Sequence, residues 1–217
     1  VWSFTGHTDF IQALAIDGNG NVYSGSSDDT VRKIDSTGSE VWSFTGHTFT
    51  VDAVAADSNG NVYSGGLDDT VRKIDSTGSE VWSFTGHADS VRALAIDSSG
   101  NVYSGSSDNT VKKIDSSGNE VWSFTGHTFS VQAVAVNSDG NVYSGGTDRT
   151  VRKLFSNGNE MWSFTGHTDT VFGLAVDSSD NVYSGSSDNT VKKIDSSGNE
   201  VWSFNASNST VLAIAFG

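Results

Sequence analysis

Histidine side chains are the first candidates for chemistry in this 217-residue sequence, because imidazole acts as a general base and as a metal ligand. The chain has five: His7, His47, His87, His127 and His167. They recur every 40 residues behind the same glycine, so all five occupy one repeated position. A catalytic centre instead needs unlike groups that converge at one place. The spacing therefore favours a structural role for the histidines.

A second candidate is the run Asp17-x-Asn19-x-Asn21, which imitates part of a calcium loop. One other copy repeats it, but the remaining copies break the pattern, with Ser99, Asn137 and Ser179 at the ligand positions. No glutamate follows at the twelfth position, where a calcium loop needs a bidentate ligand. Asparagine and glycine tolerate a positive φ, so these runs are predicted to be tight turns and no metal site is expected.

Tryptophan and glutamate recur with the same period. Indole rings stack on sugars or on a quinone cofactor, but regular spacing favours packing between repeats. The glutamates are expected to pair with basic residues across a short hairpin, because nothing singles out one copy for catalysis. Neither set predicts a catalytic residue or a cofactor; the two sets are Trp2, Trp42, Trp82, Trp122, Trp162, Trp202 and Glu40, Glu80, Glu120, Glu160, Glu200.

Charge and composition exclude several classes of protein. The formal net charge is -14, which repels nucleic acid and anionic membranes. Ten of the twelve basic residues lie in one repeated pair, first seen at Arg32-Lys33, so no basic patch is expected elsewhere. The absence of cysteine excludes disulfides and cysteine nucleophiles. No stretch approaches the roughly 20 apolar residues of a membrane helix, so neither nucleic acid nor membrane is predicted as a partner.

The repeat is the main signal of fold. Val-Trp-Ser-Phe begins at positions 1, 41, 81, 121 and 201, and Met-Trp-Ser-Phe begins at 161. We therefore predict one domain over 1–217, made of the units 1–40, 41–80, 81–120, 121–160, 161–200 and the partial unit 201–217.

Each unit predicts four short strands. In the first unit these are Ile11–Asp17, Asn21–Ser26, Thr30–Asp35 and Val41–Thr45, separated by Gly, Asn, Asp and Ser turns. No segment has a useful 3.6-residue apolar period, so no helix is expected. Four strands per roughly 40 residues is typical of a propeller blade. The predicted fold class is all-β, a β-propeller of four-stranded blades.

Two family resemblances support this architecture. The stretch GHTDFIQALAIDGNGNVYSGSSDDTVRKID resembles a WD40 repeat, except that Ile34 stands where that family has tryptophan. The stretch TVRKIDSTGSEVWSFTG resembles the quinoprotein-type, or PQQ-like, repeat. Together they cover the whole chain and imply a propeller, but propellers host unrelated activities.

The count of units predicts a six-bladed ring with an incomplete sixth blade. Val1–Phe4 would supply its outer strand and Thr210–Phe216 its inner strand. The missing hairpin would come from upstream of Val1, from a partner by strand addition, or through self-association. A five-bladed ring with a dangling last strand is the alternative, which the apolar Val211, Leu212, Ile214 and Phe216 argue against.

The resemblance to WD40 repeats implies that each histidine bonds an aspartate in a turn of its own blade. A buried pair of this kind would fix the loops that connect the strands. The implied pairs are His7 with Asp28, His47 with Asp68, His87 with Asp108, His127 with Asp148 and His167 with Asp188.

Positions at which the units differ predict a partner-binding face. In WD40-like propellers these positions lie together around one mouth of the channel, where a protein or peptide binds. The residues are Phe10, Gln12, Phe49, Asp52, Leu67, Arg92, Phe129, Gln132 and Phe172. Exposed aromatic residues mark interaction sites, so we expect a non-enzymatic interaction or structural scaffold. The alternative is a carbohydrate-binding propeller with repeated shallow sites.

Overall fold

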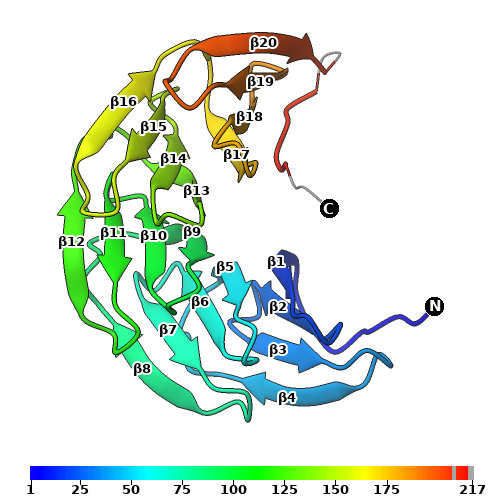
Figure 1. Ribbon diagram of the computed structural model, residues 1–217. Helices are drawn as coiled ribbons and strands as arrows, with labels where there is room; N and C mark the ends of the chain where they lie inside the picture. Colours follow the sequence, from blue (N-terminus) through cyan, green and yellow to red (C-terminus); the bar gives the residue numbers. More distant parts are fainter. Residues whose placement is uncertain (207–208, 215–217) are drawn as a thin grey trace.

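Alternating apolar and small residues between Gly, Asn and Asp turns form short antiparallel strands throughout the chain. The computed structural model describes residues 1–206 and 209–214. In these residues twenty strands make five four-stranded sheets, arranged as blades around an open arc (Figure 1). This confirms the predicted all-β architecture of four-stranded blades.

The strands of each blade run in chain order from the inside of the arc to its outer rim (Figure 1). They are β1 (Ile11–Ile16), β2 (Val22–Ser26), β3 (Val31–Ile34), β4 (Glu40–Phe44); β5 (Val51–Ala56), β6 (Val62–Gly66), β7 (Val71–Ile74), β8 (Glu80–Phe84); β9 (Val91–Ile96), β10 (Val102–Ser106), β11 (Val111–Ile114), β12 (Glu120–Phe124); β13 (Val131–Val136), β14 (Val142–Gly146), β15 (Val151–Leu154), β16 (Glu160–Phe164); and β17 (Val171–Val176), β18 (Val182–Ser186), β19 (Thr190–Ile194), β20 (Glu200–Asn205).

The core lies between neighbouring blades. In the first of these clusters Tyr23, Val31 and Phe44 of blade 1 pack against blade 2, which contributes Val51, Val62 and Ile74. The matching residues of the next blades form similar clusters. Each of the three middle sheets therefore buries both of its faces against its neighbours, which explains how so few apolar residues suffice.

Tryptophan completes each contact between blades. Trp42 Nε1 donates to the Ser76 carbonyl oxygen of the next blade at 3.2 Å, and its ring lies against Gly78. The φ of Gly78 is +91°, which few residues other than glycine adopt. The same bond recurs from Trp82, Trp122 and Trp162. These four tryptophans thus pack between blades.

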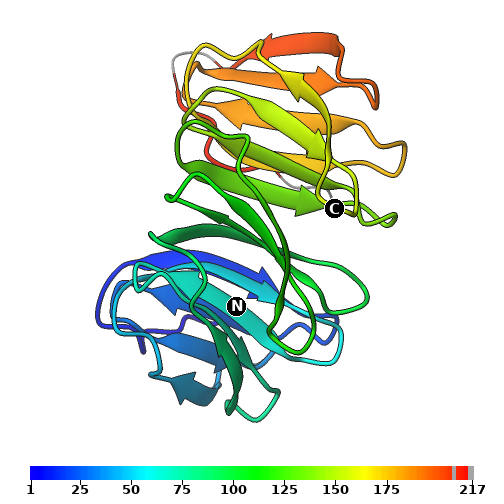
Figure 2. The same cartoon turned by 90° about the vertical axis from the view of Figure 1, so that its left-hand side faces the viewer.

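Antiparallel pairing sends the loops of every blade to two opposite faces of the arc, as Figure 2 shows from the side. One face, called here the histidine face, carries the loops from the outer strand of one blade to the inner strand of the next. It also carries the turns between the second and third strands, such as β2 and β3. The other face carries the remaining two turns of each blade.

The two predicted terminal strands are absent. Neither Val1–Phe4 nor the described part of Thr210–Phe216 is a strand, and the remainder of that second segment lies outside the described residues. The two segments share no sheet in the part of the chain that the structure describes, and the arc stays open between them (Figure 1). The backbone N–H of Val211 donates to the Ser186 carbonyl oxygen of β18 at 3.1 Å, but among the described residues neither segment is paired in a sheet. A strand needs a run of such bonds to a neighbour. The number of blades in a closed ring remains a prediction.

Candidate functional site

Each histidine on the histidine face lies beside the aspartate that the WD40 resemblance implies. Nδ1 of the ring is 2.8–2.9 Å from the carboxylate oxygen in all five blades. The pairs are His7–Asp28, His47–Asp68, His87–Asp108, His127–Asp148 and His167–Asp188.

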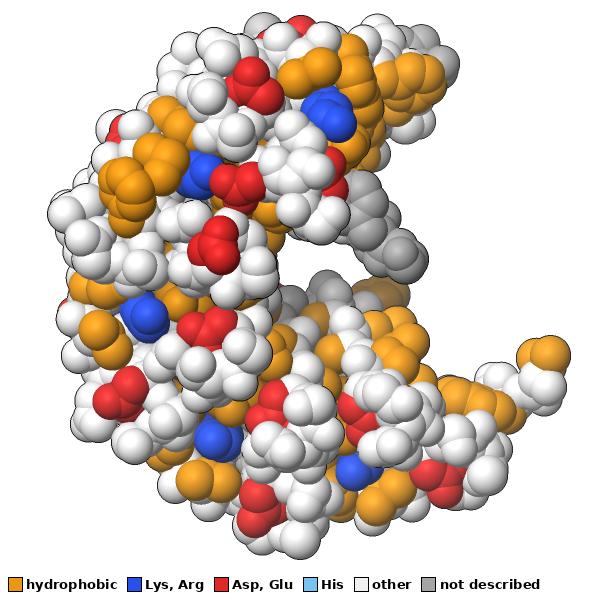
Figure 3. All heavy atoms as spheres, viewed as in Figure 1, with side chains coloured by type: hydrophobic (Ala, Val, Ile, Leu, Met, Phe, Trp, Pro, Cys, Tyr) orange, Lys and Arg blue, Asp and Glu red, His pale blue; other side chains and the backbone are white. Residues whose placement is uncertain are grey.

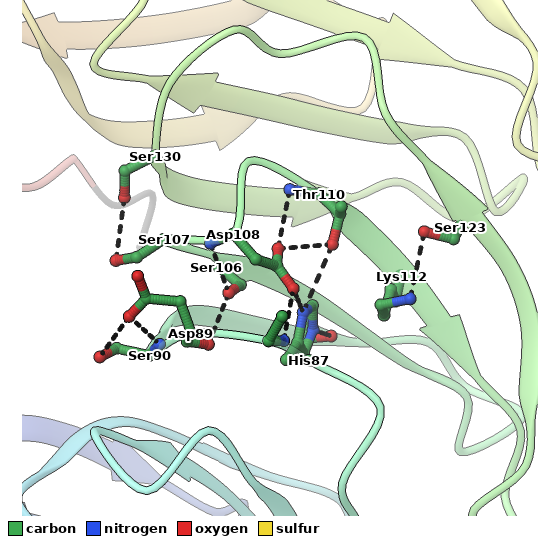
Figure 4. A network of polar contacts seen from close by, with 12 residues as sticks. His87, Asp89, Ser90, Ser106, Ser107, Asp108, Thr110, Lys112, Ser123 and Ser130 are labelled. Atoms are coloured by element: carbon green, nitrogen blue, oxygen red, sulfur yellow. Dashed lines mark hydrogen bonds and ion pairs between the residues drawn. The ribbon is translucent and has the colours of Figure 1, made fainter.

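The second nitrogen of each ring is also bonded. His87 Nε2 lies 2.7 Å from Ser104 Oγ, and Asp108 also accepts from Thr110 Oγ1 at 2.7 Å and from the backbone N–H of Ala88 at 3.0 Å (Figure 4). His87 lies in the loop between β8 and β9, whereas Asp108 and Thr110 lie in the turn between β10 and β11. Both nitrogens are therefore engaged inside the fold, and the network ties the two loops of the histidine face together.

The network perturbs the acidity of its members. Burial alone would raise the pKa of the Asp148 carboxyl, but hydrogen bonds from His127 and Thr150 outweigh it and lower the pKa to about 2. Burial lowers the pKa of His167 below its ordinary 6.5, against the opposing effect of Asp188. An ionised carboxylate beside a buried imidazole is consistent with a fixed structural pair.

The variable position of the inner strand coincides with a β-bulge. In blade 1, Ile11 pairs with Ser26 and Ala13 pairs with Gly25, so Gln12 is the extra residue. The same shift recurs in the inner strands of the other blades, and the residues concerned are Gln12, Asp52, Arg92, Gln132 and Phe172. A bulge redirects its side chain and leaves it outside the ladder. The positions that differ most are therefore the ones freed from strand pairing.

These bulge residues bond across blades. Arg92 Nη1 donates to Asp52 Oδ2 of the preceding blade at 2.6 Å, and Arg92 Nε donates to Ser107 Oγ at 3.0 Å. Ser107 accepts from Ser130 Oγ at 3.2 Å, and Ser130 accepts from Gln132 Nε2 at 2.8 Å. A continuous polar chain thus crosses three blades on the histidine face, part of which appears in Figure 4.

Apolar side chains project around this polar chain. The exposed fractions of Phe10, Phe49 and Phe129 are 77%, 60% and 61%, and that of Leu67 is 38%. All four lie in loops of the histidine face. Phe172 differs, because it is only partly exposed and lines the central channel with Leu94 and Gln132, among others. The predicted face residues therefore lie on the histidine face from blade 1 to blade 5, and Phe172 lies inside the channel mouth.

The calcium-like runs form hydrogen-bonded turns. Asp17 Oδ1 accepts from the backbone N–H groups of Asn19 and Asn21, and Asp17 Oδ2 accepts from the Tyr23 hydroxyl at 2.9 Å. The carboxylate is thus occupied by its own loop. In residues 1–206 and 209–214, no group of three or more His, Asp or Glu side chains lies close enough to hold a metal ion.

The carbohydrate-binding alternative requires repeated shallow sites, and the cavities between blades on the face opposite the histidines are the candidates for them. One of about 360 Å³ lies between blades 2 and 3 and is lined by Asp57, Asn61, Tyr63 and Lys73, among others. Tyr63 is fully buried, and burial together with the charge of Asp57 raises its pKa to about 12. Its ring is covered by Trp82 and Lys73 instead of offering a free surface for a sugar. The carbohydrate alternative is not favoured.

The described residues include no helix of the length and apolarity that crossing a membrane requires. The first basic residue of each repeated pair forms an ion pair with the glutamate of its own blade, as in Arg32 with Glu40, where Nη1 and Oε2 are 2.6 Å apart.

Two models of known protein families match this chain. A family model described as outer membrane protein assembly factor BamB, of the PQQ-like type, matches residues 27–169. The WD domain, G-beta repeat model matches residues 1–35 and 158–195. No curated protein matches the chain.

Among solved structures, the chain is similar to the crystal structure of the computationally designed Ika8 protein. The two are 34% identical, with a TM-score of 0.89, over 99% of this chain and 68% of that chain. Both family resemblances of the sequence are thus confirmed. The chain belongs to the family of WD40-like and PQQ-like repeat β-propellers.

Proposed function

We propose that this propeller is a non-enzymatic scaffold that binds a protein or peptide on its histidine face. WD40 repeat propellers generally bind protein partners. The observation that carries the proposal is the exposure of Phe10, Phe49 and Phe129 around the polar chain of the bulge residues. Aromatic anchors beside fixed polar groups are typical of binding surfaces.

The polar chain supports binding because its members are already ordered. Arg92 is held from both sides, by Asp52 and by Ser107, so little side-chain freedom remains to be lost when a partner arrives. A partner would place apolar side chains on the phenylalanines and polar groups on the chain between them. The net charge of -14 favours a partner that is not itself strongly acidic.

The histidines support the absence of catalysis. In each of the five copies both ring nitrogens bond inside the blade, to an aspartate and to a serine, so the imidazole offers no free atom to a substrate. Catalysis also needs unlike groups at one place, whereas the blades repeat the same group around the arc.

Selection of a displayed peptide library on the immobilised chain tests the proposal. Peptides that bind are expected to lose at least tenfold in affinity against Phe49→Ser and Phe129→Ser. Phe155→Ser is the matched control, because Phe155 is 44% exposed but lies in a loop of the opposite face. Binding should survive that change.

Two results would count against the proposal. Equal loss with Phe155→Ser would show that binding follows general hydrophobicity and not the histidine face. Binding of a glycan array, abolished by substitutions of Asn61 or Lys73 and untouched by Phe49→Ser, would favour the carbohydrate alternative.

A further inference from the structure

The contact between two blades has two unlike halves. The leading half, on the earlier blade, consists of a tyrosine, a valine, a phenylalanine and a tryptophan, such as Tyr63 and Phe84. The receiving half, on the later blade, consists of two valines and an isoleucine, such as Val91 and Ile114. Complementary halves of this kind bury side chains almost completely: Phe84 is 8% exposed and Ile114 is fully buried.

Blade 5 presents an uncovered leading half. Phe204, the equivalent of Phe84, is 62% exposed, and Trp202 is 41% exposed. The Val-Trp-Ser-Phe run is the same as in other units, but Asn-Ala-Ser follows it where those units have Thr-Gly-His. Phe204 therefore lacks both a following blade and the histidine ring that lies against Phe84. Exposed aromatic residues of this size are unfavourable in water unless another surface covers them.

Blade 1 presents a receiving half that is only partly covered, because Ile34, the equivalent of Ile114, is 2% exposed, whereas Ile11, the equivalent of Val91, is open to solvent. Ile11, Leu14 and Ile16 are 49%, 64% and 69% exposed, whereas their equivalents in blade 3 are buried or partly buried. Together with Trp2 they line an apolar groove of about 340 Å³. Hydrophobic side chains are accordingly visible at both ends of the arc in the space-filling view (Figure 3).

The two terminal segments already make the contacts of a further blade. Trp2 Nε1 donates to the Ser36 carbonyl oxygen at 3.2 Å, which repeats the bond from Trp42 to Ser76. Val211 packs against Gly185 as corresponding valines pack against the equivalent glycines of the other blades. At both ends of the arc, residues of the terminal segments therefore make the same contacts that their equivalents make between neighbouring blades.

The curvature of the arc sets the size of the opening. The match to the designed protein covers nearly all of this chain with a TM-score of 0.89, so the five blades are inclined to one another as in that longer chain. Because 99% of 217 residues equals 68% of that chain, its length is about 316 residues, or roughly eight units of 40. About two and a half units correspond to the unmatched remainder.

We propose that the open arc binds about two and a half further units of this same repeat, which complete an eight-bladed ring. The incoming units place a receiving half on Trp202 and Phe204 and a leading half on Ile11, Leu14 and Ile16. They also give the terminal segments the strand neighbours that they lack. An eight-bladed ring replaces the six-bladed ring expected from the count of units.

The test extends the full chain after Gly217 with copies of its own units in unbroken register. Adding a copy of residues 178–200 would complete a six-bladed ring. Adding residues 138–200 would complete a seven-bladed ring, and adding residues 98–200 would complete an eight-bladed ring. Each chain is compared with the unextended one by light scattering, thermal unfolding and binding of the apolar dye ANS. The 98–200 extension is expected to be monomeric, to have the highest Tm and to bind the least dye.

A substitution provides an independent readout in the same chains. In the 98–200 extension, Phe204→Ala should lower the Tm as much as Phe84→Ala does. In the unextended chain, Phe204→Ala should lower the Tm by less than half as much as Phe84→Ala does. A higher Tm for the 178–200 extension than for the 98–200 extension would overturn the proposal in favour of six blades. Equal Tm values and dye binding in all four chains, or head-to-tail oligomers that persist in the 98–200 extension, would also overturn it.

Discussion

Arg92 and Asp52 occupy the same position of neighbouring blades and form an ion pair, with Nη1 and Oδ2 2.6 Å apart. Both residues stand at the β-bulge of an inner strand, which turns their side chains toward each other. Burial raises the pKa of the Asp52 carboxyl, and the Arg92 charge opposes that rise. Divergence between units at one position has thus produced a contact that identical units would lack.

Replacing Arg92 with glutamine should destabilise the fold by about 1–3 kcal/mol at pH 7, because Asp52 then stays half-buried without its cation. The loss should shrink as the pH falls toward 4, since a carboxyl with a raised pKa takes up its proton more readily in the folded state. Urea denaturation at both pH values measures it. The double variant Arg92→Gln/Asp52→Asn should lose less than the sum of the single variants; simple additivity would contradict the coupling.

Removing one histidine should lower the free energy of unfolding, whereas removing metal ions should not. His47→Ala leaves Asp68 and the fully buried Ser64 without their partner, at a cost of about 1–3 kcal/mol. Thermal unfolding should show a Tm lower by about 2–4 °C for each kcal/mol. The exposed Ser58→Ala is the control and should change the stability by less than about 0.5 kcal/mol. EDTA should leave the Tm of the unaltered chain unchanged; a fall would point to a bound metal.

Acid should destabilise the protein in two stages. Burial lowers the folded pKa of His167 from 6.5, so the unfolded chain binds that proton first and stability declines as the pH falls below 6.5. The pKa of Asp148 is lowered from 3.8 to about 2, so its contribution is present above 3.8 and is lost as the pH falls through 2. The urea midpoint measured between pH 7 and pH 2 follows both stages.

Matched variants separate the acid effect of the pair from a general charge effect. Asp148→Asn should flatten the profile below pH 4, whereas Asp139→Asn, at an exposed site, should leave its shape unchanged. A midpoint that stays constant between pH 7 and pH 3 would be incompatible with this assignment.

Arg149 is expected to be a site of local strain. Its φ is 66°, a left-handed conformation that the equivalent residues of the other blades, which are aspartate or asparagine, adopt more readily. Arg149→Asn should therefore stabilise the fold by about 1 kcal/mol. Arg149→Lys keeps both the charge and the strain and should bring no gain. If the two variants have the same urea midpoint, backbone strain is not the cause.

The blades could be predicted from the amino-acid sequence, because the forces that form them act between residues close together in the chain. Alternating side chains, turns rich in Gly, Asn and Asp, and a strict 40-residue period specify four strands per unit whatever lies next to them. The aspartate partner of each histidine could also be predicted, because the resemblance to WD40 repeats implies a pair inside a single blade.

Features that depend on residues far apart in the chain became visible only in the folded structure. The bulge at Gln12 and its equivalents follows from the pairing register of two strands, which composition does not reveal. Asp180 takes a position where four units have glycine, at φ 67°, and there it bonds Lys153 and Tyr143 of the neighbouring blade. The sequence had marked that turn only as a broken calcium-like run.

The closure of the ring is also a property of the tertiary structure. The apolar terminal segments predicted two more strands, yet a strand forms only where a run of backbone hydrogen bonds joins it to a neighbour, and the described residues of these segments belong to no sheet. The count of units favoured six blades, but the angle between blades arises from how Phe84, Val91 and Ile114, and their equivalents, pack together. A repeat can specify its own blade, whereas the packing between blades sets how many of them close a ring.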